Sequence, residues 1–386
     1  MNVLDFIGEG PTLLLILVLL YLSECVIWVK RESVAFVSAW GSRWRLAVPP
    51  SWMGNANGGL LLLNPLPPAG RVFLSHLSPV SISPSGICAF NLQTLRSEAR
   101  SPYQSGELLS FNKIKEAGAD GAYLIINKEK FTKCTTAKQA RALATLVGSL
   151  AKASAAKREN LARAWVVKQF ATDEAATVLQ ESEELIKPIQ QMGVILFLFL
   201  FALTPSLAFT YGSSPLIIPV AAVMIALAIE IAIMFHRAHK KLYPAESSER
   251  LESVVKMILC PPVSIRAADI LTRNLLAEYS PIVLASVLPG SGELQFVRSV
   301  ILDLKHPLKH EVVDETAEQT ITWTAGEQLR VCLDQVKKGL YLKPEELSAP
   351  TQREENSIAY CPRCRCQFVV SDGECPDCPG VELMNF

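Results

Sequence analysis

Charged residues are missing from one long stretch of this chain. Residues 188 to 229 contain no Asp, Glu, Lys or Arg, although charged residues make up 19% of the sequence. A break at Gly212-Ser213-Ser214-Pro215 divides the stretch and predicts two helices, at 193–211 and 215–235. A third apolar segment covers residues 11–29. Each segment has roughly the ~20 residues that a helix needs to cross a ~30 Å hydrocarbon core, so we expect three transmembrane helices.

The charges beside these segments predict their orientation. Lys and Arg residues of membrane proteins gather on the cytoplasmic side. Basic residues lie next to one end of each segment, at Lys30, Arg31, Lys187, Arg237, Lys240 and Lys241. We therefore expect residues 1–10 outside the cell membrane and the large polar regions in the cytoplasm. A cleaved signal peptide is not favoured, because residues 1–10 lack the basic residues that begin one.

Short apolar runs separated by turn-forming residues characterise residues 31–135. Runs such as Val72–Leu77 and Tyr123–Ile126 are rich in apolar, β-branched or aromatic side chains, and Gly, Pro and Asn cluster between them. This pattern predicts a β-rich cytoplasmic domain. Asn127-Lys128 follows the second of these runs, which predicts a hairpin whose partner strand begins at Phe131.

The period of the hydrophobic residues changes at Thr136. Apolar residues recur every three or four positions through 136–187, which predicts one long amphipathic helix, or two, running into the second membrane segment. Residues 244–348 contain helix-capping serines and prolines at the spacing of short helices, so we expect an all-α cytoplasmic domain there. The polar residues 349–357 would form a linker.

The distribution of the cysteines indicates the cellular compartment of the protein, whereas its net charge indicates no class of partner. Lys plus Arg total 37, as do Asp plus Glu, so the charge balance indicates neither nucleic acid nor an acidic partner. Ten cysteines are present, and five of them lie between Cys361 and Cys378. Such clustering is typical of metal ligation in a reducing compartment rather than of a secreted disulfide framework.

Two Cys-x-x-Cys motifs lie in the C-terminal tail, separated by ten residues. Four thiolates at this spacing suit a tetrahedral site, and zinc is the metal that this geometry favours. We therefore expect a structural zinc ion bound by Cys361, Cys364, Cys375 and Cys378. An iron centre is the alternative occupant. Cys366 is a competing thiolate, which we leave outside the ligand set.

Residues 358–386 resemble a small zinc ribbon with rubredoxin-like knuckles, and the resemblance covers this tail alone. It implies a fold held together by its metal, in which Gln367–Val370 forms a strand and Asp372-Gly373 its turn. One departure stands out. Such knuckles usually place Gly directly after the second Cys, whereas this chain has Arg365 and Pro379 there, with Gly380 one position later.

Other ionisable residues support different hypotheses. Glu24 and Glu230 lie within the first and third apolar segments, and ionisable groups in lipid are often functional. His306 and His310 could share a metal, although Pro307 between them argues against one continuous helix. These residues would serve a membrane-embedded enzyme or transporter.

The basic stretch 128–168 supports a third hypothesis. It holds ten basic and two acidic residues, which could contact anionic lipid or nucleic acid. A solvated helix face explains the same charges. A nucleic-acid-binding membrane protein is not favoured, because no recognition motif or interleaved exposed aromatic residues accompany the charges.

The layout as a whole resembles bacterial inner-membrane proteins of unassigned function, and that resemblance assigns no residue a role. The chain contains no nucleophile motif and no phosphate-binding loop. A four-cysteine site leaves no open metal position for catalysis. We therefore expect a non-enzymatic scaffold or adaptor of the inner membrane, with the lipid bilayer and a cytoplasmic protein as partners and the zinc ribbon as a docking module.

Overall fold

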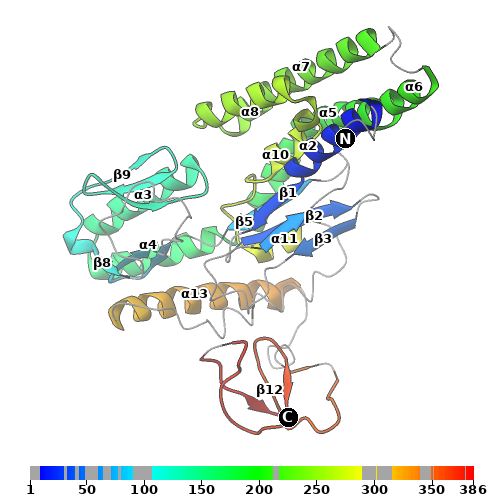
Figure 1. The fold of residues 1–386 in the computed structure, drawn as a ribbon. Coiled ribbons are helices and arrows are strands. Elements are labelled where there is room, and N and C mark those ends of the chain that lie inside the picture. The colour runs from blue at the N-terminus through cyan, green and yellow to red at the C-terminus, as the bar shows by residue number, and fades with distance from the viewer. Residues whose placement is uncertain are drawn as a thin grey trace, which may run out of the picture.

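The molecule has a helical hairpin at one end, a body of small sheets and helices, and a cysteine-rich ribbon at the other end (Figure 1). Its structure is a computed structural model. The residues it describes are 9–29, 33–39, 43–47, 60–63, 71–76, 80–89, 107–211, 217–288, 301, 315–339, 349–350, 352–378 and 380–386.

Two helices of the hairpin are long and apolar enough to cross a membrane. One runs from Thr172 to Leu207 and the other from Ile218 to Leu242, and only 28% and 22% of their most apolar stretches are buried in the molecule. The core helix of a soluble protein would be mostly buried, and these two helices are not. They overlap the second and third predicted segments, at 193–211 and 215–235, but the first begins earlier and the second ends later than predicted.

The first arm of the hairpin is almost continuous from the body to the tip. It consists of α5 (Thr172–Leu198), a π-helical turn η3 (Phe199–Leu203) and α6 (Thr204–Tyr211). The π turn ends two residues before Pro205, which has no amide hydrogen to donate to an earlier carbonyl. Instead, the Thr204 hydroxyl donates to the Phe199 carbonyl at 2.7 Å. The second arm is α7 (Ile217–Leu242), which extends beyond the predicted end at residue 235.

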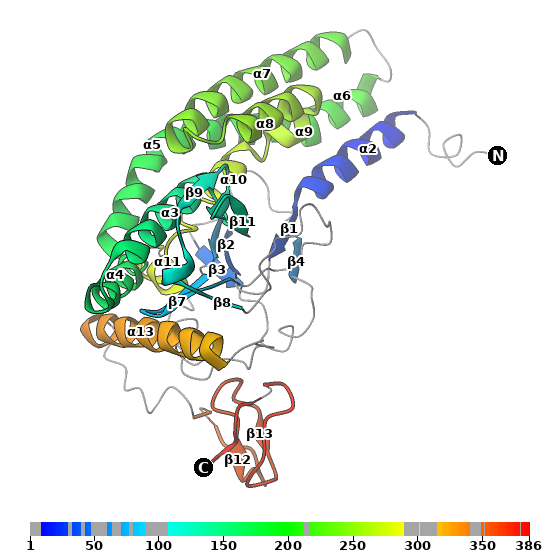
Figure 2. The same ribbon diagram turned by 90° about the vertical axis from the view of Figure 1, so that its left-hand side faces the viewer.

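The predicted helix at 11–29 is not one helix. The structure has a shorter helix, α2 (Glu9–Glu24), followed by a strand, β1 (Val26–Val29), which pairs antiparallel with β4 (Leu60–Leu63). β-Branched and aromatic residues favour an extended chain at 26–29, and β4 supplies their hydrogen-bond partners. At 16 residues, α2 is shorter than a full span, and it packs beside α6 and α9 (Figure 2).

The body contains a three-stranded antiparallel sheet of order β3-β2-β5. Its strands are β2 (Ser33–Ala39), β3 (Arg43–Ala47) and β5 (Val72–His76). The outer edge of β5 bonds to the chain near α10, where the Leu74 amide donates to the Arg273 carbonyl at 2.8 Å. Phe73 of β5 is buried in a core with residues of α4, α5, α11 and α13.

A second part of the body combines two small sheets with helices. The strands of one sheet are β6 (Val80–Ile82), β7 (Gly86–Ala89) and β8 (Leu108–Ser110), and the strands of the other are β9 (Ala117–Asp120), β10 (Tyr123–Ile126) and β11 (Glu129–Lys133). A 3-10 turn, η2 (Phe111–Lys113), connects them. The adjoining helices are α3 (Ala137–Lys152) and α4 (Ala155–Lys168).

Local signals located several of these elements correctly. Asn127 and Lys128 both have positive φ angles, 51° and 71°, and form the turn between β10 and β11. That pair of angles is typical of a tight two-residue hairpin turn. The partner strand begins at Glu129, two residues before the predicted start at Phe131. Thr136 caps α3, because its side chain accepts a hydrogen bond from the Gln139 amide.

The expected all-α region at 244–348 is helical where the structure describes it, but its helices are distributed over the molecule. They are α8 (Ser247–Leu259), α9 (Pro261–Ser264), α10 (Ala267–Thr272), α11 (Pro281–Val287) and α13 (Glu315–Gly339). Residues of α8, α9 and α10 share one core with the hairpin, and α11 joins the core around Phe73. α13 packs against α4 and the β6-β7-β8 sheet, where Thr324 donates to the Ile82 carbonyl. A separate bundle is therefore not what these segments form.

Candidate metal centre

The C-terminal ribbon is a three-stranded antiparallel sheet of order β13-β12-β14. Its strands have two residues each: β12 (Ala359–Tyr360), β13 (Gln367–Phe368) and β14 (Met384–Asn385). β13 is the strand predicted at Gln367–Val370, and it stops two residues earlier. Gly373, in the predicted turn, has a φ of 115°, a conformation that glycine adopts more readily than other residues.

Four cysteines from the two motifs meet at one point of the ribbon. The sulfur atoms of Cys361, Cys364, Cys375 and Cys378 all lie within 4.8 Å of one another. Cys361, Cys375 and Cys378 are buried, and Cys364 is half-buried. These are the four residues expected from the sequence, and they are positioned to bind a metal ion.

The sulfur geometry fits a tetrahedral ion. Cys364 Sγ lies 3.6 Å from Cys375 Sγ. Sulfur atoms about 2.3 Å from a central zinc would be roughly 3.8 Å apart along each edge of the tetrahedron. A disulfide would hold them at about 2.05 Å instead. None of the four cysteines forms a disulfide in the part of the chain that the structure describes.

The backbone turns of the two knuckles explain how the chain does without glycine after the second cysteine of each motif. Arg365 takes the left-handed conformation itself, with a φ of 63°, and its amide donates to the Cys361 carbonyl at 2.8 Å. In the other knuckle, Gly380 has a φ of 78°. The glycine one position later than usual therefore has the left-handed conformation, and Arg365 takes it at a modest conformational cost.

Neighbouring thiols and backbone amides favour ionisation of one cysteine. A hydrogen bond from the Cys364 side chain lowers the pKa of Cys361 to about 5, and backbone amides of Arg363 and Cys364 act in the same direction. The same contact raises the pKa of Cys364, because Cys364 acts as the donor. Metal ligation requires thiolates, and a bound cation would favour the ionised form of all four groups.

The hydrophobic core of the ribbon consists mainly of these ligands. Its buried residues are Cys361, Cys375, Cys378 and Val381, with Cys364, Phe368 and Leu383 packed against them. So small a core cannot stabilise a fold alone. The metal ion would supply most of the folding energy, on the order of 10 kcal/mol in comparable peptides.

Cys366 lies outside the four-sulfur site, as expected. It is exposed, and its thiol lies 3.9 Å from a carboxylate oxygen of Asp377. Cys364, Cys366 and Asp377 form a second group of possible ligands that shares Cys364 with the first. The first group already provides the four thiolates that a tetrahedral ion needs. A substitution of Cys366 is therefore a suitable control for substitutions of those four cysteines.

The alternative site residues are not brought together in the part of the chain that the structure describes. Glu230 is exposed on the surface of α7, and Glu24 is the last residue of α2. His306 and His310 lie outside the described residues. His236 is exposed at the end of α7, whereas His239 is buried between the rings of Phe235 and Tyr243.

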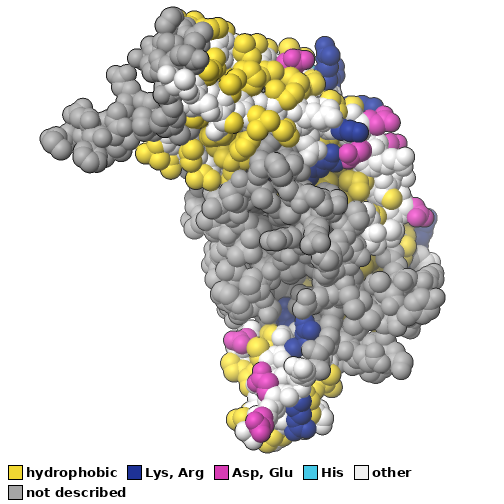
Figure 3. Space-filling view, turned by 90° about the vertical axis from the view of Figure 1, so that its right-hand side faces the viewer, with side chains coloured by type: hydrophobic (Ala, Val, Ile, Leu, Met, Phe, Trp, Pro, Cys, Tyr) yellow, Lys and Arg dark blue, Asp and Glu magenta, His cyan; other side chains and the backbone are white. Residues whose placement is uncertain are grey.

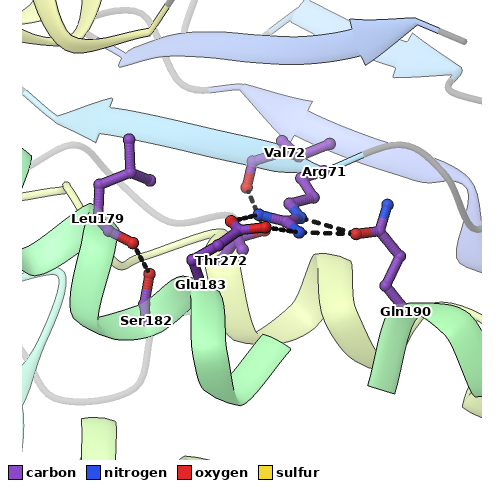
Figure 4. A network of polar contacts seen from close by, with 7 residues as sticks. All are labelled: Arg71, Val72, Leu179, Ser182, Glu183, Gln190 and Thr272. Carbon is purple, nitrogen blue, oxygen red and sulfur yellow. Dashed lines mark hydrogen bonds and ion pairs between the residues drawn. The ribbon is translucent and has the colours of Figure 1, made fainter. Parts of the chain in front are cut away.

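One polar network at the base of the hairpin was missed from the sequence. Arg71, just before β5, forms a two-pronged ion pair with Glu183 of α5 and also donates to Gln190 (Figure 4). These partners are 112 and 119 residues away along the chain. No local pattern marks such a pairing, since Arg71 stands alone in its segment.

A second missed pair is buried completely. Arg266 and Asp269 are each 1% exposed and form an ion pair, and Arg273 contributes a longer contact to the same carboxylate at 3.6 Å. The pair lies beside Tyr21 and Cys25 of the α2 end, whose electrostatic interactions reach Arg266. A buried charge requires a partner, and Asp269 provides it for Arg266. Through its interactions with Tyr21 and Cys25, Arg266 also connects α10 with α2.

Comparisons with known proteins do not extend these findings: no family model, no curated protein and no solved structure matches the chain.

Proposed function

We propose that this protein is a non-enzymatic, membrane-anchored adaptor of the bacterial inner membrane. Its hairpin spans the bilayer, its body lies in the cytoplasm, and its zinc ribbon docks a protein partner. The observation that carries the proposal is the position of the ribbon at the end of the molecule opposite the hairpin (Figure 2). A docking module in that position projects away from the membrane.

The exposed surface of the hairpin supports the membrane assignment. Hydrophobic side chains gather over this end of the molecule, while charged side chains lie at its margin and on the body (Figure 3). On α7 the exposed residues Ile225, Ile229 and Ile233 form a row at helical spacing. On α2 the exposed residues are Leu15, Ile16, Leu19 and Leu20. Leaving so much apolar surface in water would be unfavourable, so lipid is the fitting environment.

The charges at the base of the hairpin support a cytoplasmic body. Lys187 lies midway along α5, directly before the uncharged stretch, and Arg237, Lys240 and Lys241 lie near the C-terminal end of α7; all four are exposed. The positive-inside rule then assigns this end to the cytoplasm, with the hairpin tip and the N-terminus outside. α2 would lie in the bilayer as a third, shorter element, since Tyr21 packs on Phe197 and Phe201.

A closed metal site supports docking rather than catalysis. Four cysteine ligands would leave a zinc ion no open position for water or substrate. The ribbon also exposes hydrophobic residues, among them Ile358 (46% exposed), Val369 (68%) and Val370 (52%). Exposed apolar side chains on so small a module are suited to contact with another protein.

A native pull-down tests the proposal. The full chain is isolated in mild detergent, and bound proteins are identified by mass spectrometry for the wild type, Cys375→Ser/Cys378→Ser and Cys366→Ser. We expect a specific partner with the wild type and Cys366→Ser that is lost with the double variant. If the double variant inserts in the membrane normally and keeps the same partner, the docking role of the ribbon is wrong.

A further inference from the structure

Helix α8 has an exposed apolar side that the packing of the protein does not explain. Its inner side packs along α7, where Met257 is buried in the same core as Ile231 and Phe235. Four large apolar residues of α8 remain exposed to solvent: Leu251 (64% exposed), Val255 (45%), Ile258 (42%) and Leu259 (79%). Leu259 is the most exposed large hydrophobic side chain among the residues described.

The exposed surface of α8 is divided into two flanks. At 100° per residue, the four apolar residues fall on one flank beside the contact with α7. Glu249, Glu252 and Lys256 fall on the other flank, and Lys256 pairs with Glu252 at 2.6 Å. Such a division of polar and apolar flanks on an exposed helix is typical of helices that lie at a membrane surface.

Helix α8 runs back alongside the second arm of the hairpin. α7 ends at Leu242 and α8 begins at Ser247, so the chain reverses within four residues and runs back along α7 (Figures 1 and 2). The C-terminal end of α8 therefore approaches the level of the exposed isoleucines of α7. The exposed row on α7 ends at Ile233 and is followed by His236 and Arg237, which marks the expected edge of the bilayer.

We propose that α8 is a lipid-contacting helix that dips into the cytoplasmic leaflet beside α7. Leu251, Val255, Ile258 and Leu259 contact acyl chains, while Glu249, Glu252 and Lys256 remain in the headgroup layer. This inference rests on the proposed membrane insertion of the hairpin. Its occupant is the bilayer, because α8 packs along α7 and both helices expose apolar rows, of which the row on α7 faces lipid in the proposed insertion.

Fluorescence quenching by lipid tests the position of α8. A genetically encoded environment-sensitive amino acid avoids cysteine labelling, which the ribbon would confound. It replaces Val255, Leu259, Glu252 or Ile225 in the full chain, one position per variant. Each variant is reconstituted in vesicles of phosphatidylcholine and phosphatidylglycerol with brominated acyl chains. We expect bromolipid to quench the probes at Val255 and Leu259 about as strongly as the one at Ile225, and aqueous iodide to quench only the one at Glu252.

Each other outcome is decisive. Iodide quenching at Val255 and Leu259 without bromolipid quenching overturns the proposal, and so does protection from both quenchers, which would indicate a protein cover. If the probe at Ile225 is also unquenched by bromolipid, the membrane insertion itself is wrong. The unsubstituted protein provides a second test with a diazirine lipid. Carbene adducts on α8 peptides support the proposal, and adducts on α7 without any on α8 refute it.

Discussion

Cys364 Sγ and Cys375 Sγ lie 3.6 Å apart although they belong to different knuckles of the ribbon. The distance is too long for a disulfide and close to the edge of a tetrahedral zinc–thiolate site. The two cysteines therefore bring the two Cys-x-x-Cys motifs to one metal ion. The same contact joins the two knuckles of the ribbon, so a bound ion would lie at the centre of its fold.

We expect the purified chain to contain one zinc ion per molecule, and Cys375→Ser/Cys378→Ser to contain none. Metal analysis by mass spectrometry measures the content. Cys366→Ser is the control and should keep the wild-type stoichiometry. Iron in place of zinc, or loss of metal from the control, would contradict the assignment.

The same ribbon should unfold when its metal is removed. A strong chelator is expected to make residues 358–386 sensitive to protease while the hairpin and body stay intact, because the core of the ribbon consists mainly of ligands. Limited proteolysis with peptide mapping gives the result. Protection of the tail after complete metal removal would mean that the ribbon folds without its ion.

The buried pair Arg266–Asp269 predicts a large cost when one partner is neutralised. Asp269→Asn leaves the Arg266 charge buried without its counter-charge, and we expect a loss of about 3–5 kcal/mol. Urea denaturation of the detergent-solubilised chain measures it. Arg266→Met/Asp269→Leu should recover most of the loss, because two apolar side chains leave no buried charge.

The exposed pair Glu252–Lys256 of α8 is a matched control for that experiment, since it has similar chemistry at the surface. Glu252→Gln is expected to leave the urea midpoint unchanged. Equal effects of Asp269→Asn and Glu252→Gln would show that burial is not what makes the Arg266–Asp269 pair matter.

Arg71 at the base of the hairpin should not be replaceable by lysine. Its guanidinium group contacts both Glu183 and Gln190, and the ammonium group of lysine cannot match that two-pronged geometry. We expect Arg71→Lys to destabilise the chain by about 1 kcal/mol, since Glu183 is partly exposed. Urea denaturation of the detergent-solubilised chain measures the change, and Arg330→Lys, at an exposed position on α13, should have no effect in the same measurement.

Glu246, between α7 and α8, predicts a pH-dependent effect. Burial and the nearby Glu249 raise the pKa of Glu246 above its ordinary value. The folded chain binds this proton more tightly than the unfolded chain. The carboxyl group of Glu246 therefore stabilises the folded chain at pH values below its ordinary pKa. This contribution is lost as the pH rises through the raised pKa of the folded chain.

Glu246→Gln should accordingly be more stable than the wild type at neutral pH, by less than about 1 kcal/mol because the group is half-exposed. Glutamine keeps an oxygen for the hydrogen bond from the Ala137 amide at 3.4 Å. The difference should vanish below about pH 4, where the carboxyl is protonated in both states. Thermal melts at both pH values give the comparison, and an advantage that grows in acid would contradict the reasoning.

Glu230 distinguishes the adaptor from a membrane-embedded enzyme or transporter. Its side chain is exposed on α7, and among the described residues it is not grouped with other possible metal ligands. We expect Glu230→Gln to leave membrane insertion, zinc content and partner capture unchanged. If cells that carry Glu230→Gln behave like cells that lack the protein, although the variant inserts in the membrane and captures its partner, the enzyme or transporter is favoured instead.

The sequence determined the features that depend on local order. The uncharged stretch and its Gly-Ser-Ser-Pro break predicted the hairpin, because apolar length alone indicates such helices. The cysteine spacing predicted the four-sulfur site, because two Cys-x-x-Cys motifs need only a short loop to meet. The turn at Asn127-Lys128 followed from Asn127, a residue type that tolerates positive φ, placed between two strand-forming runs.

Only the tertiary structure decided the rest, because the deciding contacts join distant segments. Val26–Val29 is a strand since Leu60–Leu63 lies beside it, although its apolar residues also suit a helix. The helices from residue 247 onward pack mainly on the hairpin and the sheets and do not form a domain of their own, which their own hydrophobic period could not reveal. Arg71 and Glu183 are 112 residues apart, and only the folded chain brings the charge and its partner together.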